Sequence, residues 1–584
     1  MITEKKATNK LIFIVLPLSV FLMGIGLHDV HGVLRLLGLV FGTFVLFLFT
    51  SKKLIARNKI QYLLWALVFG YLIIQLIVRN NIYQFLLGNY SRNGGFIALI
   101  CFALIFNLVS NYKHSLGDVF IKTIIFTLYG LVIFGFLEKY SLLPFTIESK
   151  YEGAVALTLV NPNFASSYLA IALSTFIFSK LLSLNKKSMI NAIIIILSIF
   201  IFFQTNSLQG YLLFVVNIFL FLLYKRKYIF KISRWLRMFL LSVSGVFLLF
   251  LTANILKIFS WVLENGSVTQ RLNYWSLVID IWRDHFLIGI GLESLRDYAP
   301  KYRTETLVRQ EGIFTNPDRA HNVFLDHFVQ GGLLVGLIWL FFVGTITFLA
   351  IKNLLSKSHS LSQTDFIIVV IWFSYVVQSA ISVDHLALTL LGIISAALIT
   401  KNNINSWVNL NSRKVSKTNN FSQLTLVSVF FLSCAIFLGQ VIEFEYWARD
   451  ITDRKNPKNL EKIYTSRIIV PQTLEDIAVE VSKTKNFEVA NRFAIKLLTH
   501  RPSSHQGYYI KSVFFESKSD LELAKTNMLK ALDLDPFNSV YLLSMAIYEY
   551  KSSNLDIAKD YFLRAQETNP NQEGLDIVSK YITY

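Results

Sequence analysis

Positively charged side chains gather in the polar stretch between residues 257 and 327. The stretch ends in Arg319-Ala320-His321-Asn322. Such groups at a membrane surface are usually only solvated, but guanidinium groups also bind phosphate oxygens in pairs. A cluster on the side of a membrane where loops normally lack positive charge therefore predicts an anionic lipid headgroup, above all a diphosphate, as ligand. The cluster consists of Arg271, Arg283, Arg296, Lys301, Arg303, Arg309 and Arg319.

Three shorter polar motifs lie elsewhere in the chain. Asn161-Pro162-Asn163 fits a helix start with Asn161 as the cap, and a helix start can also orient a phosphate, so both interpretations stay open. Asp384 and His385 form a second candidate pair in a predicted turn. Arg92 stands in Gly88-Asn-Tyr-Ser-Arg92-Asn-Gly94.

Metal and nucleotide chemistry are not predicted. The pairs His28 and His31, and His321 and His327, lack the acidic or thiolate partners that zinc commonly recruits. The only Asp-x-Asp triplet begins at Asp533 in the polar tail, and no Walker phosphate loop occurs. We therefore expect no metal and no cofactor, and the energy for any transfer must come from the donor.

The composition is that of a membrane protein. Of 584 residues, 54% are hydrophobic and only 16% are charged, whereas about a quarter of an ordinary soluble domain is charged. This excludes a soluble enzyme of this length. The net charge of +19 in so apolar a chain indicates lipid-facing loops and not a nucleic-acid groove. Cys101 and Cys434 both lie in apolar runs, so no disulfide framework is expected.

The elements that must position these residues are apolar runs of about 20 residues, the length that crosses the hydrocarbon of a bilayer. We predict an all-α, polytopic bundle of about 12–13 spans. The thirteen runs lie near residues 11–27, 30–50, 60–78, 94–110, 118–137, 164–184, 189–204, 207–224, 236–256, 328–350, 365–381, 384–400 and 424–442.

Lysine and arginine are distributed unequally between alternate connections. With the N-terminus inside, the inner segments hold 23 of them, and the short outer loops hold only Arg79, Arg92, Lys139 and Lys150. Because positive loops resist translocation, we predict a multi-pass cell-membrane protein with a cytoplasmic N-terminus. The long loop 257–327 and everything after the last span would then lie outside.

The polar tail after the last span repeats itself. Ala490, Ala524 and Ala558 recur at a spacing of 34, as do Pro502, Pro536 and Pro570. A period of 34 with small residues at fixed positions is typical of paired antiparallel helices. The tail resembles the tetratricopeptide repeat over residues 471–572. We therefore divide the chain into a transmembrane domain, 1–450, and a soluble α-solenoid, 451–584, which would bind a peptide or protein partner.

Several motifs in the membrane part resemble the signature region of the O-antigen ligase and polymerase superfamily. They are Arg271-Leu-Asn-Tyr-Trp275, Leu287-Ile-Gly289-Ile-Gly291, Ala320-His321-Asn322 and Gly331-Gly332-Leu333, with weaker motifs at 88–94 and 161–163. Members with tetratricopeptide-like tails occur in this family.

The resemblance implies a metal-independent glycosyltransferase of cell-surface polysaccharide biosynthesis. It would move a glycan from undecaprenyl diphosphate onto a hydroxyl of a glycan, lipid or protein acceptor. The resemblance implies that His321 is the catalytic residue that takes the acceptor proton and that Arg271 stabilises the departing diphosphate. The substrate-binding candidates are Arg92, Arg319, Asn163, Asn322 and Gln209.

One departure from the family concerns the segment Asn206-Ser207-Leu208-Gln209-Gly210. Many relatives carry a Ser-Arg pair there, and this chain has no arginine. Arg92, Arg319 or another residue must then supply the second positive charge. Two other functions stay open: a transporter or flippase of lipid-linked glycans, and an inactive scaffold of an assembly complex.

Overall fold

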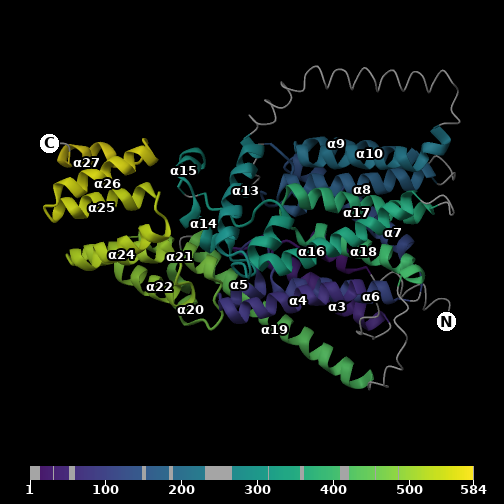
Figure 1. Ribbon diagram of the computed structural model, residues 1–584, viewed down its shortest axis with the longest axis horizontal. Helices are drawn as coiled ribbons and strands as arrows, with labels where there is room; N and C mark the ends of the chain where they lie inside the picture. The colour runs from purple at the N-terminus through teal and green to yellow at the C-terminus, as the bar shows by residue number, and fades with distance from the viewer. Residues whose placement is uncertain are drawn as a thin grey trace, which may run out of the picture.

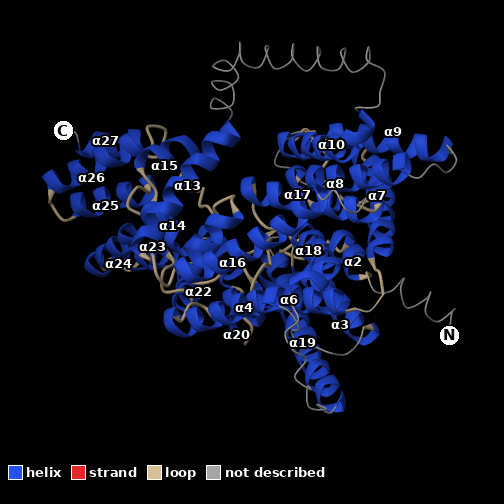
Figure 2. Ribbon diagram, turned by 45° about the vertical axis from the view of Figure 1, so that its right-hand side comes forward, coloured by secondary structure: helices blue, strands red, loops and turns tan. Residues whose placement is uncertain are grey.

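The computed structural model describes residues 13–30, 32–50, 59–112, 114–147, 153–182, 189–229, 266–313, 315–355, 361–407, 420–453, 456–484 and 486–582. Over these residues the chain forms helices joined by loops, without a β-strand (Figure 2). The predicted all-α class is confirmed. The molecule is long, with a bundle of apolar helices toward its N-terminus and an array of short helices at its C-terminal end (Figure 1).

Helices occupy twelve of the thirteen predicted apolar runs, and the run 236–256 lies outside the described residues. Seven helices in the described part are long and apolar enough to cross a membrane: α4 (Lys59–Val78), α7 (Gly117–Lys139), α10 (Leu208–Ile229), α16 (Val323–Leu355), α17 (Gln363–Ile381), α18 (Leu386–Trp407) and α19 (Asn420–Thr452). The others are α2 (Val15–Phe21), α3 (Val33–Phe49), α6 (Phe96–Asn111), α8 (Pro162–Leu182) and α9 (Met189–Gln204).

The first run does not form the full helix that its apolar composition predicts. The helix α2 ends at Phe21, because Leu22 is extended and Gly26 takes the left-handed value φ 100°. The N–H of Gly24 then donates to the carbonyl oxygen of Val30 at 2.9 Å and closes a loop. Glycine adopts positive φ without the steric penalty that other residues suffer, so the helix ends at Phe21 and not at the predicted end of the run.

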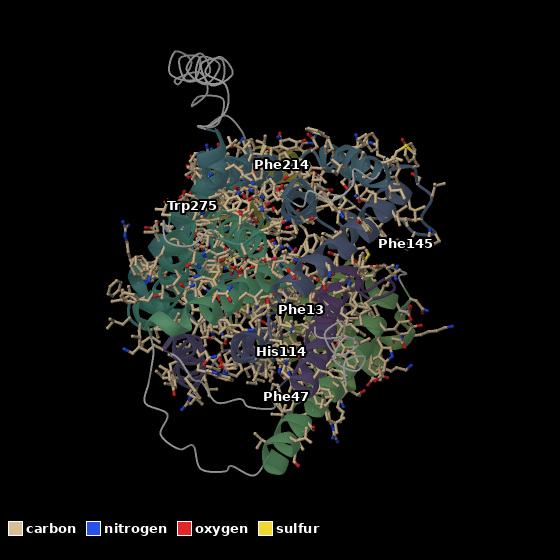
Figure 3. All side chains as sticks on the ribbon, turned by 90° about the vertical axis from the view of Figure 1, so that its right-hand side faces the viewer. Phe13, Phe47, His114, Phe145, Phe214 and Trp275 are labelled. Carbon is tan, nitrogen blue, oxygen red and sulfur yellow. The ribbon has the colours of Figure 1, made fainter. Side chains whose placement is uncertain are left out.

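The long helices run side by side, as Figure 1 shows for α3, α4, α16, α17 and α18. Viewed along the long axis, Phe13 lies among the helices of the bundle, and Trp275 lies apart from it (Figure 3). Phe13 is 1% exposed, and the large side chains Trp372 and Tyr375 are buried to a similar degree. Large apolar residues such as Phe69, Leu76 and Phe126 are exposed on the flanks of the bundle, as expected for helices that face lipid.

Hydrogen bonds join the ends of neighbouring helices at the two opposite ends of the bundle. At one end Gln61 donates to Asn111 (3.0 Å), Gln363 to the carbonyl oxygen of Ser179 (2.8 Å), and Asn402 to Asp365 (2.7 Å). The lysine-rich segments of the sequence adjoin these residues. Contacts such as that between Arg271 and the carbonyl oxygen of Ile381 (2.9 Å) lie at the other end.

The helix α16 is broken at Gly332, which has φ 63° and ψ −172°. The segment before α16 fills the break. The N–H of Ile290 donates to the carbonyl oxygen of Val329, and that of Gly291 to the carbonyl oxygen of Gln330, both at 2.9 Å. A Cβ on Gly289 would lie 2.4 Å from the nitrogen of Gly332. The two glycine motifs of the sequence are thus the two sides of one close backbone contact.

The stretch that the sequence predicts as a long loop contains three helices in its described part. They are α13 (Gly266–Asp284), α14 (Leu295–Tyr302) and α15 (Glu305–Glu311), and Figure 1 shows them between the bundle and the array. Leu277, Ile281, Ile290 and Val329 pack into a small core that joins α13 to the first turns of α16. The charged stretch is therefore a packed layer over one end of the bundle.

The C-terminal array follows the sequence period. Its first helices start 34 residues apart and its second helices likewise. The bounds are α21 (Pro471–Lys483), α22 (Phe487–His500), α23 (His505–Ser517), α24 (Leu521–Leu534), α25 (Ser539–Lys551), α26 (Leu555–Thr568) and α27 (Leu575–Ile582), after η2 (Pro457–Asn459) and α20 (Leu460–Thr465). The three alanines of the repeat are at most 1% exposed. The second helices of the three pairs end just before Arg501, Asp535 and Asn569.

The array is docked onto the layer by buried ion pairs. Nη2 of Arg303 donates to Asp535 Oδ1 at 2.7 Å, and these side chains are 2% and 0% exposed. Arg501 pairs with Asp297 of α14 and with Glu475 of α21, the latter at 2.8 Å. Tyr83, in α5 (Ile82–Leu87), donates to the carbonyl oxygen of Arg467 at 2.7 Å. Bundle, layer and array therefore form a continuous contact.

Candidate functional site

A cavity of about 690 Å³ opens among the helix ends beneath the layer. We call it the bundle cavity. One part of its wall is apolar, from α4, α6, α16 and α18, and the other part carries charged groups from the connecting loops. Its lining residues are Leu64, Tyr71, Arg92, Gly94, Leu99, Phe102, Leu292, Glu293, Arg319, Asp326, His327, Gln330, Trp339, Asp384, Leu386, Thr389 and Ile393.

Three hydrogen-bond donors in this wall have no acceptor among the described residues. They are Nε of Arg319, Nε2 of Gln330 and Nε1 of Trp339. The orientation of the Gln330 amide is set by its other end, because Oε1 accepts from the N–H of Glu293 at 2.9 Å. One buried acceptor of the wall, Asp326 Oδ2, is also without a hydrogen-bond partner in the described structure. Buried polar groups are nearly always satisfied in folded proteins, so three open donors beside one open acceptor indicate a ligand rich in acceptors.

Arg319 is the centre of the charged wall. It is 5% exposed, donates to Glu293, and has Nη1 3.9 Å from Asp326 Oδ2. Burial alone would lower the pKa of this guanidinium, but the carboxylates of Glu293 and Asp326 outweigh burial and raise it. Arg319 therefore stays charged. Glu293 is also held by the N–H of Asn89, at 3.0 Å.

Arg92 stands at the second charged corner of the bundle cavity. Its Nε donates to Asp318 Oδ2 at 2.8 Å, and its guanidinium lies 5.7 Å from the centre of the Phe164 ring. Burial would raise the pKa of Asp318, yet Arg92 and the nearby charge of His321 hold it below its usual range. Asp318 therefore stays ionised and fixes the guanidinium of Arg92 at the cavity.

His321 lies beside this corner in an unusual backbone conformation, with φ 54°. Its ring centre is 5.6 Å from that of Tyr274 on α13. The residues on either side hold it in place: the N–H of Ala320 donates to Asp326 at 2.8 Å, and Asn322 caps α16 by accepting from the N–H of Phe324 at 3.0 Å. A non-glycine residue at positive φ is uncommon, and strain of this kind concentrates at functional sites.

Arg271 is one helical turn from Tyr274 on α13. It donates to the carbonyl oxygen of Ile381 and to that of Ser267, each at 2.9 Å. Of the predicted pair, His321 is in ring contact with Tyr274, and Arg271 stands three residues before Tyr274 on α13. Neither is among the described residues that line the bundle cavity.

Asn163 and Gln209 meet at the starts of α8 and α10. The N–H of Asn163 donates to Asn161 Oδ1 at 2.9 Å, so Asn161 does cap α8. Asn163 Oδ1 accepts from Ser207 at 2.7 Å, and Gln209 Nε2 donates to Ser167 at 2.8 Å. This cluster reaches the bundle cavity through Phe164, the residue after Asn163, whose ring lies against Arg92.

Asp384 lines the bundle cavity, and Nη1 of Arg35 lies 3.5 Å from Nε2 of His385. Sequence analysis missed Glu293, Asp326, Gln330 and Trp339. A signal was present, because Asp326 and Gln330 are four residues apart and so share one face of an otherwise apolar helix. Across the part of the chain that the structure covers, no group of three His, Cys, Asp or Glu side chains is arranged to hold a metal ion.

The family comparison falls on this region. Residues 193–340 match the family model described as O-antigen ligase. The match includes α13, the first part of α16 with its break at Gly332, and most of the charged wall, and it leaves out the array. It supports the O-antigen ligase superfamily and, with it, a membrane enzyme of the glycan-transferring ligase type that acts on a lipid-linked glycan and an acceptor. No curated protein and no solved structure matches the chain.

Proposed function

We propose that this protein transfers a glycan from an undecaprenyl-diphosphate carrier onto an acceptor hydroxyl. The observation that carries the proposal is the bundle cavity, in which three unpartnered donors and two arginines face an apolar wall. Phosphate oxygens would satisfy the donors, and the isoprenoid would lie along the apolar wall between the helices.

The chemistry is a substitution at the anomeric carbon of the glycan. The acceptor oxygen forms a bond to that carbon, the bond from carbon to phosphate oxygen breaks, and the isoprenyl diphosphate leaves with the electron pair. His321 takes the acceptor proton, and Arg271 and Arg92 stabilise the charge that develops on the diphosphate. Arg319 and Gln330 bind the ground-state diphosphate, and Asn163, Asn322 and Gln209 shape the site around it. No metal and no cofactor takes part in this scheme.

The proposed site faces the outside of the cytoplasmic membrane. The described lysines Lys59, Lys180, Lys352 and Lys401 belong to helix ends remote from the charged wall, and by the positive-inside rule that end is cytoplasmic. The array, which we propose to be a tetratricopeptide solenoid that binds a protein partner or acceptor, shares the outer side with the cavity. A single cysteine at Gln310 would then react with an impermeant maleimide in intact cells.

The decisive experiment is the replacement His321→Ala in the full chain, reconstituted with labelled lipid-linked glycan and acceptor. A general base contributes about 10²–10⁴-fold to rate, so transfer should fall by at least 100-fold without a change in protein level. The matched control is His285→Ala, because His285 packs on Tyr298 at 5.2 Å between ring centres and has no role in the scheme. Full activity of the first variant would refute the role of His321.

A lipid-linked glycan transporter is the second candidate, and the break in α16 is the observation that favours it, since transporters use interrupted helices. The break is held by backbone bonds to residues 286–291 under the layer. Liposomes that carry labelled donor and acceptor separate the candidates. Covalent transfer without net translocation supports the enzyme, and translocation without transfer supports the transporter.

A further inference from the structure

A second cavity, of about 330 Å³, lies where the bundle, the layer and the array meet. We call it the junction pocket. This volume includes space that is open to solvent, so the pocket takes the charged group of one sugar residue and not a chain. Its lining includes Tyr83, Gln84, Tyr90, Arg296, Gln472 and Arg501.

The two arginines of the junction pocket differ in what they bind. Arg501 donates through Nη1 to Glu475 at 2.8 Å and through Nε to Asp297, so it belongs to the framework. The side chain of Arg296 donates to no acceptor within the described ranges, and its Nε is buried without a partner. The charge of Arg296 acts on Glu475, but the hydrogen bonds of that carboxylate go to Arg501 and to Ser504 (2.7 Å). One guanidinium is therefore available for an anionic ligand.

The remaining wall is polar and fixed. The hydroxyl of Tyr83 donates to the carbonyl oxygen of Arg467, and that of Tyr90 to the carbonyl oxygen of His28. Gln84 donates to the carbonyl oxygen of Glu293 at 2.7 Å, and Gln472 to Asp476 at 3.0 Å. Rigid phenol rings with amide groups offer flat apolar contact together with hydrogen bonds, which suits a sugar ring and not an acyl chain.

One short loop separates the junction pocket from the bundle cavity. Gly88, Asn89 and Tyr90 line the junction pocket, and Arg92 and Gly94 line the bundle cavity. The N–H of Asn89 donates to Glu293, which in turn binds Arg319. The two cavities are therefore neighbours. A glycan whose diphosphate lies in the bundle cavity, or an acceptor that attacks beside it, reaches the junction pocket and Arg296.

We propose that the junction pocket binds an acidic sugar residue, one that carries a carboxylate or a phosphate, and that Arg296 pairs with its charge. The inference rests on the proposed function only for the origin of that sugar. It assigns the array a part in substrate recognition, because Gln472 and Arg501 come from the array and complete the pocket.

The test uses the purified full chain in nanodiscs and measures binding of an oligosaccharide that contains glucuronate, with its neutral glucose counterpart as the second probe. Arg296→Gln should weaken binding of the acidic probe at least 10-fold and leave the neutral probe unchanged. Arg296→Lys, which keeps the charge, should retain most of the binding. The control Arg283→Gln removes an exposed arginine of the same layer, which pairs with Asp280 at 2.9 Å, and it should change the binding of neither probe.

Equal binding of both probes, or binding that Arg296→Gln leaves unchanged, would overturn the inference. The thermal unfolding profile of Arg296→Gln shows whether this variant folds normally, so that its loss of binding can be assigned to the lost charge. If the profile shifts, recovery of acidic-probe binding in Arg296→Lys tests the role of the charge instead. The same binding titration in the His321→Ala variant separates the proposed glycan transfer from the proposed acidic-sugar binding. That variant should not transfer glycan, so binding of the acidic probe to it tests the junction pocket alone. In transfer assays, Arg296→Gln should raise the KM of the substrate that carries the acidic sugar, either the donor or the acceptor. If neither KM rises, the result contradicts the proposed role of the junction pocket.

Discussion

Two buried arginine networks lie at the same end of the molecule, and they differ in how completely their donors are used. In the junction network, Arg303 and Arg501 tie the layer to the array through Asp535, Asp297 and Glu475. Arg303 also donates to the carbonyl oxygens of Ile313 (3.0 Å) and Thr315 (2.8 Å), and only its Nε is without an acceptor in the described structure. In the bundle cavity, Arg319, Gln330 and Trp339 each keep a donor without an acceptor in the described structure.

The difference distinguishes a network that holds the structure together from a site that binds a ligand. A buried ion pair adds little net stability over an apolar pair but fixes one geometry, because each charge tolerates only its partner. The junction network therefore holds the charged layer in one position over the bundle. Donors left open around a cavity instead carry a free-energy penalty that an acceptor-rich ligand removes on binding.

The largest expected effect comes from breaking the junction network. Arg303→Met leaves Asp535, which is 0% exposed, without its charge partner and should lower the free energy of unfolding by about 3–5 kcal/mol. Thermal unfolding of the full chain in nanodiscs measures it. The double variant Arg303→Met with Asp535→Leu should recover much of the loss, and equal instability of the single and double variants would contradict the interpretation.

A matched pair of tryptophans sharpens the comparison. Nε1 of Trp339 has no acceptor in the described structure, whereas Nε1 of Trp372 donates to Thr347 at 3.1 Å. Trp339→Phe should leave stability nearly unchanged and weaken binding of an isoprenyl diphosphate by the value of one hydrogen bond, about 1 kcal/mol or roughly fivefold. Trp372→Phe should lower stability by a similar amount and leave binding of the isoprenyl diphosphate unchanged. A loss of binding in both variants would show that the cavity responds only to packing.

The smallest expected effect is a difference in pH dependence. Burial raises the pKa of Asp384 in the bundle cavity to about 6, so its contribution to stability is complete below the unfolded pKa near 3.9 and is lost as pH rises through 6. For Glu475 burial acts in the same direction, but Arg501 outweighs it and lowers the pKa. Its contribution is present above the unfolded pKa near 4.3 and is lost as pH falls.

Thermal unfolding between pH 4 and 7.5 compares these two carboxylates. Relative to the unmodified protein, Asp384→Asn should gain stability as pH rises from about 4 to about 6 and should then level off. Glu475→Gln should show its full deficit above pH 5 and a smaller one at pH 4. Parallel pH profiles for the two variants would mean that the networks do not differ in the way described.

The sequence predicts the local regularities of the chain well. Twelve apolar runs form helices where the hydropathy places them, and the period of 34 gives the starts of the array helices, because both patterns depend on residues close in the sequence. The first run fails as a full helix because Gly24 and Gly26 form a loop there, which average hydropathy does not register.

The sequence alone determined that the chain is helical, crosses a membrane and carries its polar chemistry at one end, since composition and spacing carry that information. The tertiary structure decided which charges meet. Arg319 was predicted as a ligand of the substrate, but only the fold pairs it with Glu293 and places Gln330 and Trp339 beside it. Ion pairs and cavities join residues far apart in the chain, and their partners follow from packing and not from any local pattern.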